Sequence, residues 1–199
     1  MNLSELNSLT DLFFYQAKKQ NSESVFLEWL NPKNKKKFTW GETSSNIYKL
    51  AKTLKTNITD GDRCLLVSEN RPEWLISDIA IMLANGITVP AYTTYTEKDY
   101  KYLIEDCQPS VIIVSNDEMH DKLKNIIDES SFIRKVITFE KIQKINNKNK
   151  YLDFDSITKN NLQESDKIKN VSIKRNSPAC IIYTSGTSGN PKGVILSHG

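Results

Sequence analysis

The residues that most clearly suggest chemistry lie at 179–193, where an apolar run leads into a loop rich in hydroxyl groups and glycine. Residues 179–183 have the composition of a buried strand, and the sequence Thr-Ser-Gly-Thr-Ser-Gly follows at 184–189. Glycine allows positive-φ conformations that turn successive N–H groups toward an anion, and Lys192 adds a positive charge. These residues predict a site that binds a polyphosphate.

The spacing of this loop separates it from the other common phosphate-binding loops. A Walker A loop needs Gly-Lys followed by Ser or Thr, whereas Pro191 precedes Lys192 here and Gly193 follows it. No G-x-G-x-x-G is present, which excludes the dinucleotide-binding fingerprint and the glycine-rich loop of kinases. The plainer alternative is a Ser/Gly-rich surface turn between two strands.

Alternating helix and strand patterns lead up to the loop and must position it. Thr39 and Glu42 have the spacing of a capping box, and an apolar stripe behind them predicts a helix to about Lys55. We expect later strands at 64–67, 87–91, 111–114 and 135–139, with helices that begin at Pro72, near Thr96 and after a capping pattern at 115–118. Repeats of this length predict a doubly wound, mostly parallel α/β sheet, in which ligands bind beyond the carboxyl ends of the strands.

Three further segments have recognisable patterns. Residues 9–18 have helical spacing, and the β-type runs 25–30 and 37–40 predict a small N-terminal hairpin. We interpret its lysine-rich tip as a solvated loop, with contact to anionic lipid as the alternative. Residues 141–150 are polar and of low complexity, which predicts a flexible insertion.

The composition narrows the class of protein. The net charge is +3, but only four of the 27 basic residues are arginine, which argues against a nucleic-acid-binding surface. The three cysteines form no C-x-x-C pair, and neither they nor the two histidines have the spacing of a metal site. No segment approaches the roughly 20 apolar residues of a membrane span, and residues 1–10 lack the pattern of a signal peptide. We therefore expect a cytoplasmic protein with buried, reduced thiols.

The signature Y-T-S-G-T-[ST]-G-x-P-K-G fits the loop at every position up to Lys192, with Ser188 at the place of a commoner threonine. The chain thereby resembles the adenylate-forming (AMP-binding) superfamily, which includes acyl-CoA synthetases, luciferases and the adenylation domains of peptide synthetases. Asn-Arg-Pro-Glu-Trp at 70–74 and Val-Pro-Ala-Tyr at 89–92 are similar to the long-chain fatty acid–CoA ligases.

The resemblance implies a reaction in two steps. A carboxylate attacks the α-phosphate of Mg²⁺-ATP, which gives an acyl-adenylate and pyrophosphate, and the thiol of coenzyme A then takes the acyl group. Donors already in place stabilise the charge that builds on the leaving pyrophosphate. The residues that match the family's phosphate loop are Thr184, Ser185, Gly186, Thr187, Ser188, Gly189 and Lys192. The resemblance assigns no catalytic residue and no metal ligand, because the family's other motifs lie downstream.

By the same resemblance, residues 1–199 are the N-terminal part of a larger adenylate-forming domain and are inactive alone. The last strand, at 194–197, has no following helix of the kind that a parallel sheet needs. A fatty substrate leaves room for peripheral contact with the inner face of the membrane, and the oligomeric state stays open. Two alternatives remain: a non-catalytic nucleotide- or phosphate-binding module, and an adenylating enzyme with a different acid or acceptor.

Overall fold

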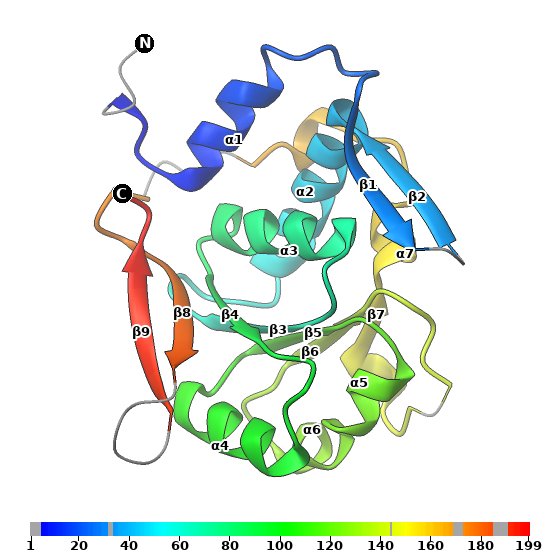
Figure 1. Ribbon diagram of the computed structural model, residues 1–199, viewed down its shortest axis with the longest axis vertical. Coiled ribbons are helices and arrows are strands. Elements are labelled where there is room, and N and C mark those ends of the chain that lie inside the picture. The colour runs from blue at the N-terminus through cyan, green and yellow to red at the C-terminus, as the bar shows by residue number, and fades with distance from the viewer. Residues whose placement is uncertain (1–4, 32–33, 144, 169–172, 185–190) are drawn as a thin grey trace.

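A seven-stranded sheet forms the centre of the protein in the computed structural model, which describes residues 5–31, 34–143, 145–168, 173–184 and 191–199 (Figure 1). The strand order is β7-β6-β5-β3-β4-β8-β9, and all neighbours pair in parallel except β8 and β9. The strands are β3 (Arg63–Val67), β4 (Ile87–Ala91), β5 (Val111–Val114), β6 (Lys135–Thr138), β7 (Tyr151–Asp153), β8 (Pro178–Thr184) and β9 (Lys192–Ser197). The predicted doubly wound, mostly parallel α/β sheet is confirmed.

Helices cover both faces of the sheet because its central strands are apolar on both sides. Successive residues of a strand point to opposite faces, so Leu66 and Ile113 belong to one buried cluster and Leu65 and Ile112 to the other. Helices α1, α2 and α3 cover the first face, and α4, α5 and α6 cover the second (Figure 1). The helices are α1 (Leu9–Ala17), α2 (Trp40–Lys55), α3 (Pro72–Leu83), α4 (Glu97–Cys107), α5 (Asp117–Asp121), α6 (Lys124–Glu129) and α7 (Phe154–Thr158), with single turns η2 (Lys148–Lys150) and η3 (Glu164–Asp166).

The predicted capping box begins α2. The Thr39 hydroxyl accepts the N–H of Glu42 at 3.1 Å, and the Glu42 carboxylate accepts the N–H of Thr39 at 2.8 Å. Thr96 and Asp99 form the same arrangement at the start of α4. Each box satisfies N–H groups that have no partner within the helix itself, which fixes where the helix begins.

Replacing Thr39 with alanine should lower the free energy of unfolding by about 1 kcal/mol, because one N–H group of the first turn loses its acceptor. Urea denaturation followed by circular dichroism measures this change. Thr39→Ser keeps the oxygen and should stay close to the wild type. Equal losses in the two variants would contradict a capping role for the hydroxyl.

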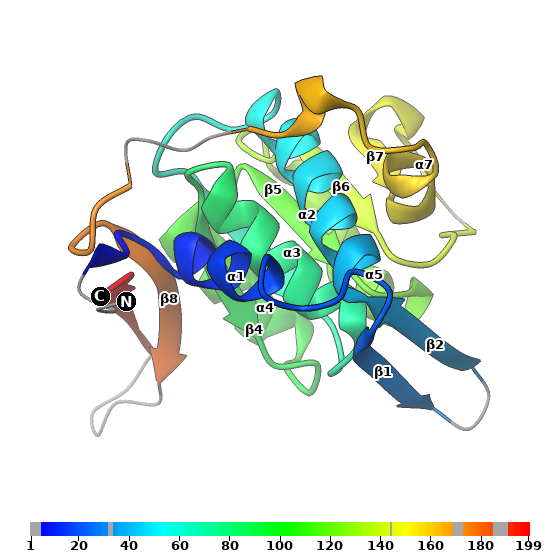
Figure 2. The same ribbon diagram turned by 90° about the horizontal axis from the view of Figure 1, so that it is seen from above.

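The predicted N-terminal hairpin is confirmed and stands apart from the sheet (Figure 2). It consists of β1 (Val25–Asn31) and β2 (Asn34–Thr39). Lys36 of β2 donates to the Glu73 carboxylate at 3.0 Å, and the Arg71 guanidinium lies 4.4 Å from the centre of the Trp29 ring. Arg71 also donates to Glu73 at 2.9 Å and to Glu140 at 2.8 Å. This network is buried at Arg71 and Glu73 and partly exposed at Lys36 and Glu140, and it joins the hairpin, the start of α3 and the loop after β6.

The segment after β5 differs from the prediction. We expected one helix after a cap at 115–118, whereas two short helices, α5 and α6, follow. Asn116 is the N-cap of α5, since its side-chain oxygen accepts the N–H of Met119 at 3.0 Å. The Ser115 side chain is instead buried, and its hydroxyl has no hydrogen-bond partner among the described residues. The capping spacing was present, but it placed the cap one residue too early.

The C-terminal strand also differs from the parallel arrangement that was assumed for it. β9 pairs antiparallel with β8 as a hairpin, so no crossover helix is needed between them. β9 begins two residues earlier than expected, at Lys192, and its paired partner is Thr184. Along β9, Val194, Ile195 and Leu196 are 45%, 63% and 44% exposed.

Two smaller differences have local causes. Trp40 was expected to end a strand, but it is the first residue of α2 because Thr39 caps that helix. β7 and α7 were not predicted, because with three and five residues they are too short to show a clear periodic pattern. They follow a stretch rich in lysine and asparagine. Within residues 141–150, Ile142 is buried and the Lys150 ammonium donates to the Ile127 carbonyl at 2.6 Å. The flexibility of that insertion stays a prediction.

Candidate phosphate-binding site

The β8–β9 hairpin closes the predicted phosphate loop. Thr184 ends β8 and Lys192 begins β9, and the two residues are direct partners across the hairpin. The structure therefore brings together the first and last of the predicted site residues. The others, Ser185, Gly186, Thr187, Ser188 and Gly189, lie outside the described residues.

The loop leaves the sheet at the edge where ligands bind in this class of fold. β8 runs parallel to β4, so its carboxyl end lies at the same edge as the carboxyl ends of β4 and β3. A cavity of about 590 Å³ opens there. It is lined by Ser68, Glu69, Asn70, Trp74, Pro90, Ala91, Tyr92, Thr93, Ile182 and Tyr183. Aromatic and apolar side chains with a few polar groups are typical of a small-molecule site.

Gly193, which follows Lys192, was not among the predicted site residues, but its position is sterically restricted. It pairs with Tyr183 across the hairpin, and a Cβ atom on it would lie 2.8 Å from Ile181 Cγ2 and 3.3 Å from Tyr183 Cζ. A larger residue would therefore force the Ile181 side chain to shift and would crowd the Tyr183 ring, which lies one residue before Thr184. The glycine after Lys192 in the loop motif was the available signal.

Helix α4 contacts both stems of the loop. The Tyr183 hydroxyl donates to the Asp106 carboxylate, and the Tyr102 hydroxyl donates to the Pro191 carbonyl at 2.9 Å. Burial, and then the hydrogen bond to Asp106, raise the pKa of Tyr183. The phenol therefore stays protonated and remains a donor at neutral pH. Neither Tyr102 nor Asp106 was predicted, because nothing in a single sequence connects them with a loop some 80 residues away.

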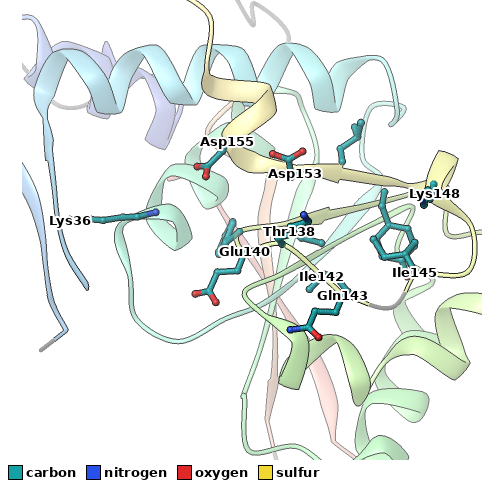
Figure 3. A pocket seen from close by; sticks show the side chains of 13 residues that line it. Lys36, Thr138, Glu140, Ile142, Gln143, Ile145, Lys148, Asp153 and Asp155 are labelled. Atoms are coloured by element: carbon teal, nitrogen blue, oxygen red, sulfur yellow. The ribbon is translucent and has the colours of Figure 1, made fainter. Parts of the chain in front are cut away.

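A larger cavity, of about 840 Å³, opens at the other half of the sheet, beyond β6 and β7 (Figure 3). Its charged side chains are of both signs, and Figure 3 shows Asp153, Asp155 and Glu140 between Lys36 on one side and Lys148 on the other. Such a balanced lining has no preference for a polyphosphate. Three strands, β5, β3 and β4, separate β6 from β8, so this cavity is not part of the candidate site.

The described residues show no cluster of the metal-ligand type, since no three His, Cys, Asp or Glu side chains among them gather together. His120 shares a hydrogen bond with the Tyr151 hydroxyl at 2.8 Å, and His198 accepts the N–H of Leu9 at 3.3 Å. Cys64 and Cys107 are buried as expected, whereas Cys180 is only half-buried. None of the described helices combines the length and apolar character needed to cross a membrane.

The fold and the adjoining cavity define an α/β protein in which the predicted phosphate loop joins two strands at the carboxyl edge of the sheet. The model of the AMP-binding enzyme family matches residues 13–199, and the chain belongs to that family. Long-chain-fatty-acid–CoA ligase ACSBG2 of Gallus gallus is 30% identical over 192 residues, which cover 90% of this chain and 25% of that protein. The corresponding ligase of Xenopus laevis is 31% identical over 132 residues, or 65% of this chain and 18% of that protein.

Solved structures show the same fold. The anthranilate CoA ligase AuaEII, in complex with anthranoyl-AMP, superimposes with a TM-score of 0.83 at 20% identity, over all of this chain and 36% of that one. A luciferase-like enzyme from Zophobas morio superimposes with a TM-score of 0.80 over 96% of this chain and 43% of that one. The chain spans about a fifth to a quarter of the length of the curated relatives described here.

Proposed function

We propose that this chain is the N-terminal part of an ATP-dependent ligase that activates a carboxylic acid as an acyl-adenylate and transfers the acyl group to coenzyme A. The observation that carries the proposal is the hairpin that pairs Thr184 with Lys192 beside a cavity at the carboxyl edge of the sheet. The family match over residues 13–199 supports the adenylating chemistry. The similarity to long-chain fatty acid ligases supports a long-chain fatty acid as the substrate.

The proposed first step is an in-line displacement at the α-phosphate of ATP. A carboxylate oxygen forms a bond to phosphorus, the bond to the bridging oxygen of pyrophosphate breaks, and the electron pair leaves with the pyrophosphate. Residues 184–189 and Lys192 hold the β- and γ-phosphates through hydroxyl groups, backbone N–H groups and the Lys192 ammonium. These donors stabilise the charge that develops on the departing pyrophosphate.

The co-substrates follow from the same proposal. Magnesium would enter bound to the phosphate oxygens of ATP, where it neutralises charge, and this chain would supply no side-chain ligand to it. The coenzyme A thiol would take the acyl group in the second step and release AMP. We propose a cytoplasmic protein, which a fatty substrate would bring to the inner face of the membrane, and we propose no nucleic-acid partner.

Acid-dependent release of pyrophosphate tests the proposal. The assay needs a protein that contains this chain and is as long as the full-length ligases it resembles. We expect release from ATP to require an acid and to increase toward long acyl chains, and AMP and thioester to appear when coenzyme A is added. Release with amino acids or short acids alone would indicate a different substrate, and adenylate without a thioester a different acceptor. No release with any acid, together with retained ATP binding, would indicate a non-catalytic nucleotide-binding module.

A further inference from the structure

One face of helix α4 holds both stems of the predicted phosphate loop. Tyr102 and Asp106 are four residues apart, so their side chains lie one turn apart on the same side of the helix. Tyr102 bonds the carbonyl of Pro191, the residue immediately before Lys192. Asp106 accepts the hydroxyl of Tyr183, the residue immediately before Thr184. Each predicted phosphate ligand that the structure describes is therefore one residue away from a contact with α4.

Helix α4 is itself fixed firmly to the sheet. Tyr100 is fully buried, and its hydroxyl donates to the Tyr92 carbonyl at 2.7 Å. At the other end, the Arg63 guanidinium donates to the carbonyls of Cys107 at 2.7 Å and Gln108 at 3.2 Å. With its first turn capped and its last carbonyls bonded, the helix provides a rigid frame for whatever it contacts.

The two contacts differ in strength, but both reach residues next to the paired ends of the β8–β9 hairpin. The bond to Asp106 joins a protonated phenol to a carboxylate, and such charge-assisted bonds are among the stronger hydrogen bonds in proteins. The bond to Pro191 is neutral, and it reaches a residue that has no N–H of its own to pair with a neighbouring strand. Between the two contacts, the pairing of Thr184 with Lys192 transmits any displacement of one stem to the other.

We propose that Tyr102 and Asp106 are positioning residues that hold Thr184 and Lys192 in the geometry needed to bind the ATP phosphates. This inference rests on the proposed function. A side chain contributes to binding a leaving group only within hydrogen-bond distance of it, so a displacement of about 1 Å at the stems weakens the contact markedly. Neither residue touches the nucleotide in this proposal, and both act through the hairpin.

Two measurements on the 199-residue chain test the inference. Amide hydrogen exchange in peptides that span 178–197 reports the opening of the hairpin, and a titration with ATP followed by NMR reports phosphate binding. We expect wild-type binding of ATP in the millimolar range or weaker. Tyr102→Phe should accelerate exchange and weaken binding by about fivefold, the effect of one neutral hydrogen bond. Asp106→Asn should have a larger effect, about tenfold, because it removes the charge from its bond.

The matched controls are Tyr15→Phe on α1 and Glu105→Gln, which alters the acid next to Asp106. Both should leave the exchange of 178–197 and the binding of ATP unchanged, and peptides from α2 should exchange at wild-type rates in all four variants. Unchanged exchange and binding in Tyr102→Phe and Asp106→Asn would overturn the inference, as would faster exchange without weaker binding. Micromolar binding of ATP by the wild-type chain would count instead against the proposed function and would favour a nucleotide-binding module.

Discussion

Replacing Arg71 with alanine should lower the free energy of unfolding by about 3–5 kcal/mol, the loss expected when one partner of a buried ion pair is removed. The side chains of Arg71 and Glu73 are only 2% and 1% exposed, so the variant would leave a buried carboxylate with Lys36 as its remaining cation. The variant also loses the packing of the guanidinium against Trp29. Urea denaturation monitored by circular dichroism measures the change.

Two control variants separate the buried pair from the exposed one. Glu140→Gln removes a partner whose side chain is 49% exposed, and it should cost less than about 1 kcal/mol. Arg71→Met combined with Glu73→Gln removes both buried charges, so it should recover much of the loss. A loss below 1 kcal/mol in Arg71→Ala would show that the network contributes little to stability.

The pH dependence gives a second measure of the same network. Burial alone would raise the pKa of Glu73, but the hydrogen bonds and charge of Arg71 outweigh it, and the pKa lies below the ordinary value of 4.5. The stabilisation is therefore complete above pH 4.5 and is lost as the pH falls through the folded-state pKa. In Arg71→Ala we expect burial to dominate and this sign to reverse. The variant would then gain stability as the pH falls toward 4.5, measured as the urea midpoint against pH.

Lys192→Ala should reduce the first half-reaction of the proposed ligase by about 1.5–3 kcal/mol of transition-state stabilisation, because it removes a charge-assisted contact to phosphate. If the contact strengthens as pyrophosphate leaves, both kcat and the KM for ATP should suffer. Thioester formation from a supplied acyl-adenylate involves no pyrophosphate and should be nearly unchanged. ATP–pyrophosphate exchange and thioester formation, assayed separately, measure the two steps.

Two control variants accompany Lys192→Ala, one at a neutral residue of the predicted site and one at a lysine elsewhere. Thr187→Ala removes a neutral donor, so its effect on the first step should be nearer 1 kcal/mol. Lys124→Ala, at an exposed lysine of α6, should affect neither half-reaction. Equal losses of both half-reactions in Lys192→Ala would mean that the substitution disrupts the hairpin, and the assignment of Lys192 to the phosphates would then fail.

Much of the fold could be predicted because its signals are local. The capping boxes at Thr39 and Thr96 and the apolar runs of the central strands each act over a few residues, and they fixed most helix starts and strand positions. Some errors were local, such as the cap of α5, and one concerns the pairing of strands. Whether β9 joins the sheet parallel or antiparallel depends on β8, and the apolar run of β9 is compatible with both directions.

The residues of the candidate site also fall into those with a local sequence signal and those brought together only by packing. Thr184 and Lys192 could be predicted from a motif of contiguous residues, and the structure places them as partners. Tyr102 and Asp106 could not, because their contacts with Pro191 and Tyr183 exist only once α4 has packed on the sheet. The buried network of Arg71 was likewise beyond reach, since the sequence shows Arg71 and Glu73 merely as a helix start.

The alternation of buried residues along the strands has a consequence for combining mutations. Arg71 lies with α3 on one face of the sheet, and Tyr102 and Asp106 lie with α4 on the other, with the strands between them (Figure 1). Residues that share no partner and are separated by a packed layer perturb a protein independently. The free-energy changes of Arg71 and Tyr102 variants should therefore sum in double mutants. Substitutions on the two faces of the sheet should thus be energetically independent, so stability could be engineered on the α3 face without changing the contacts that α4 makes with Tyr183 and Pro191.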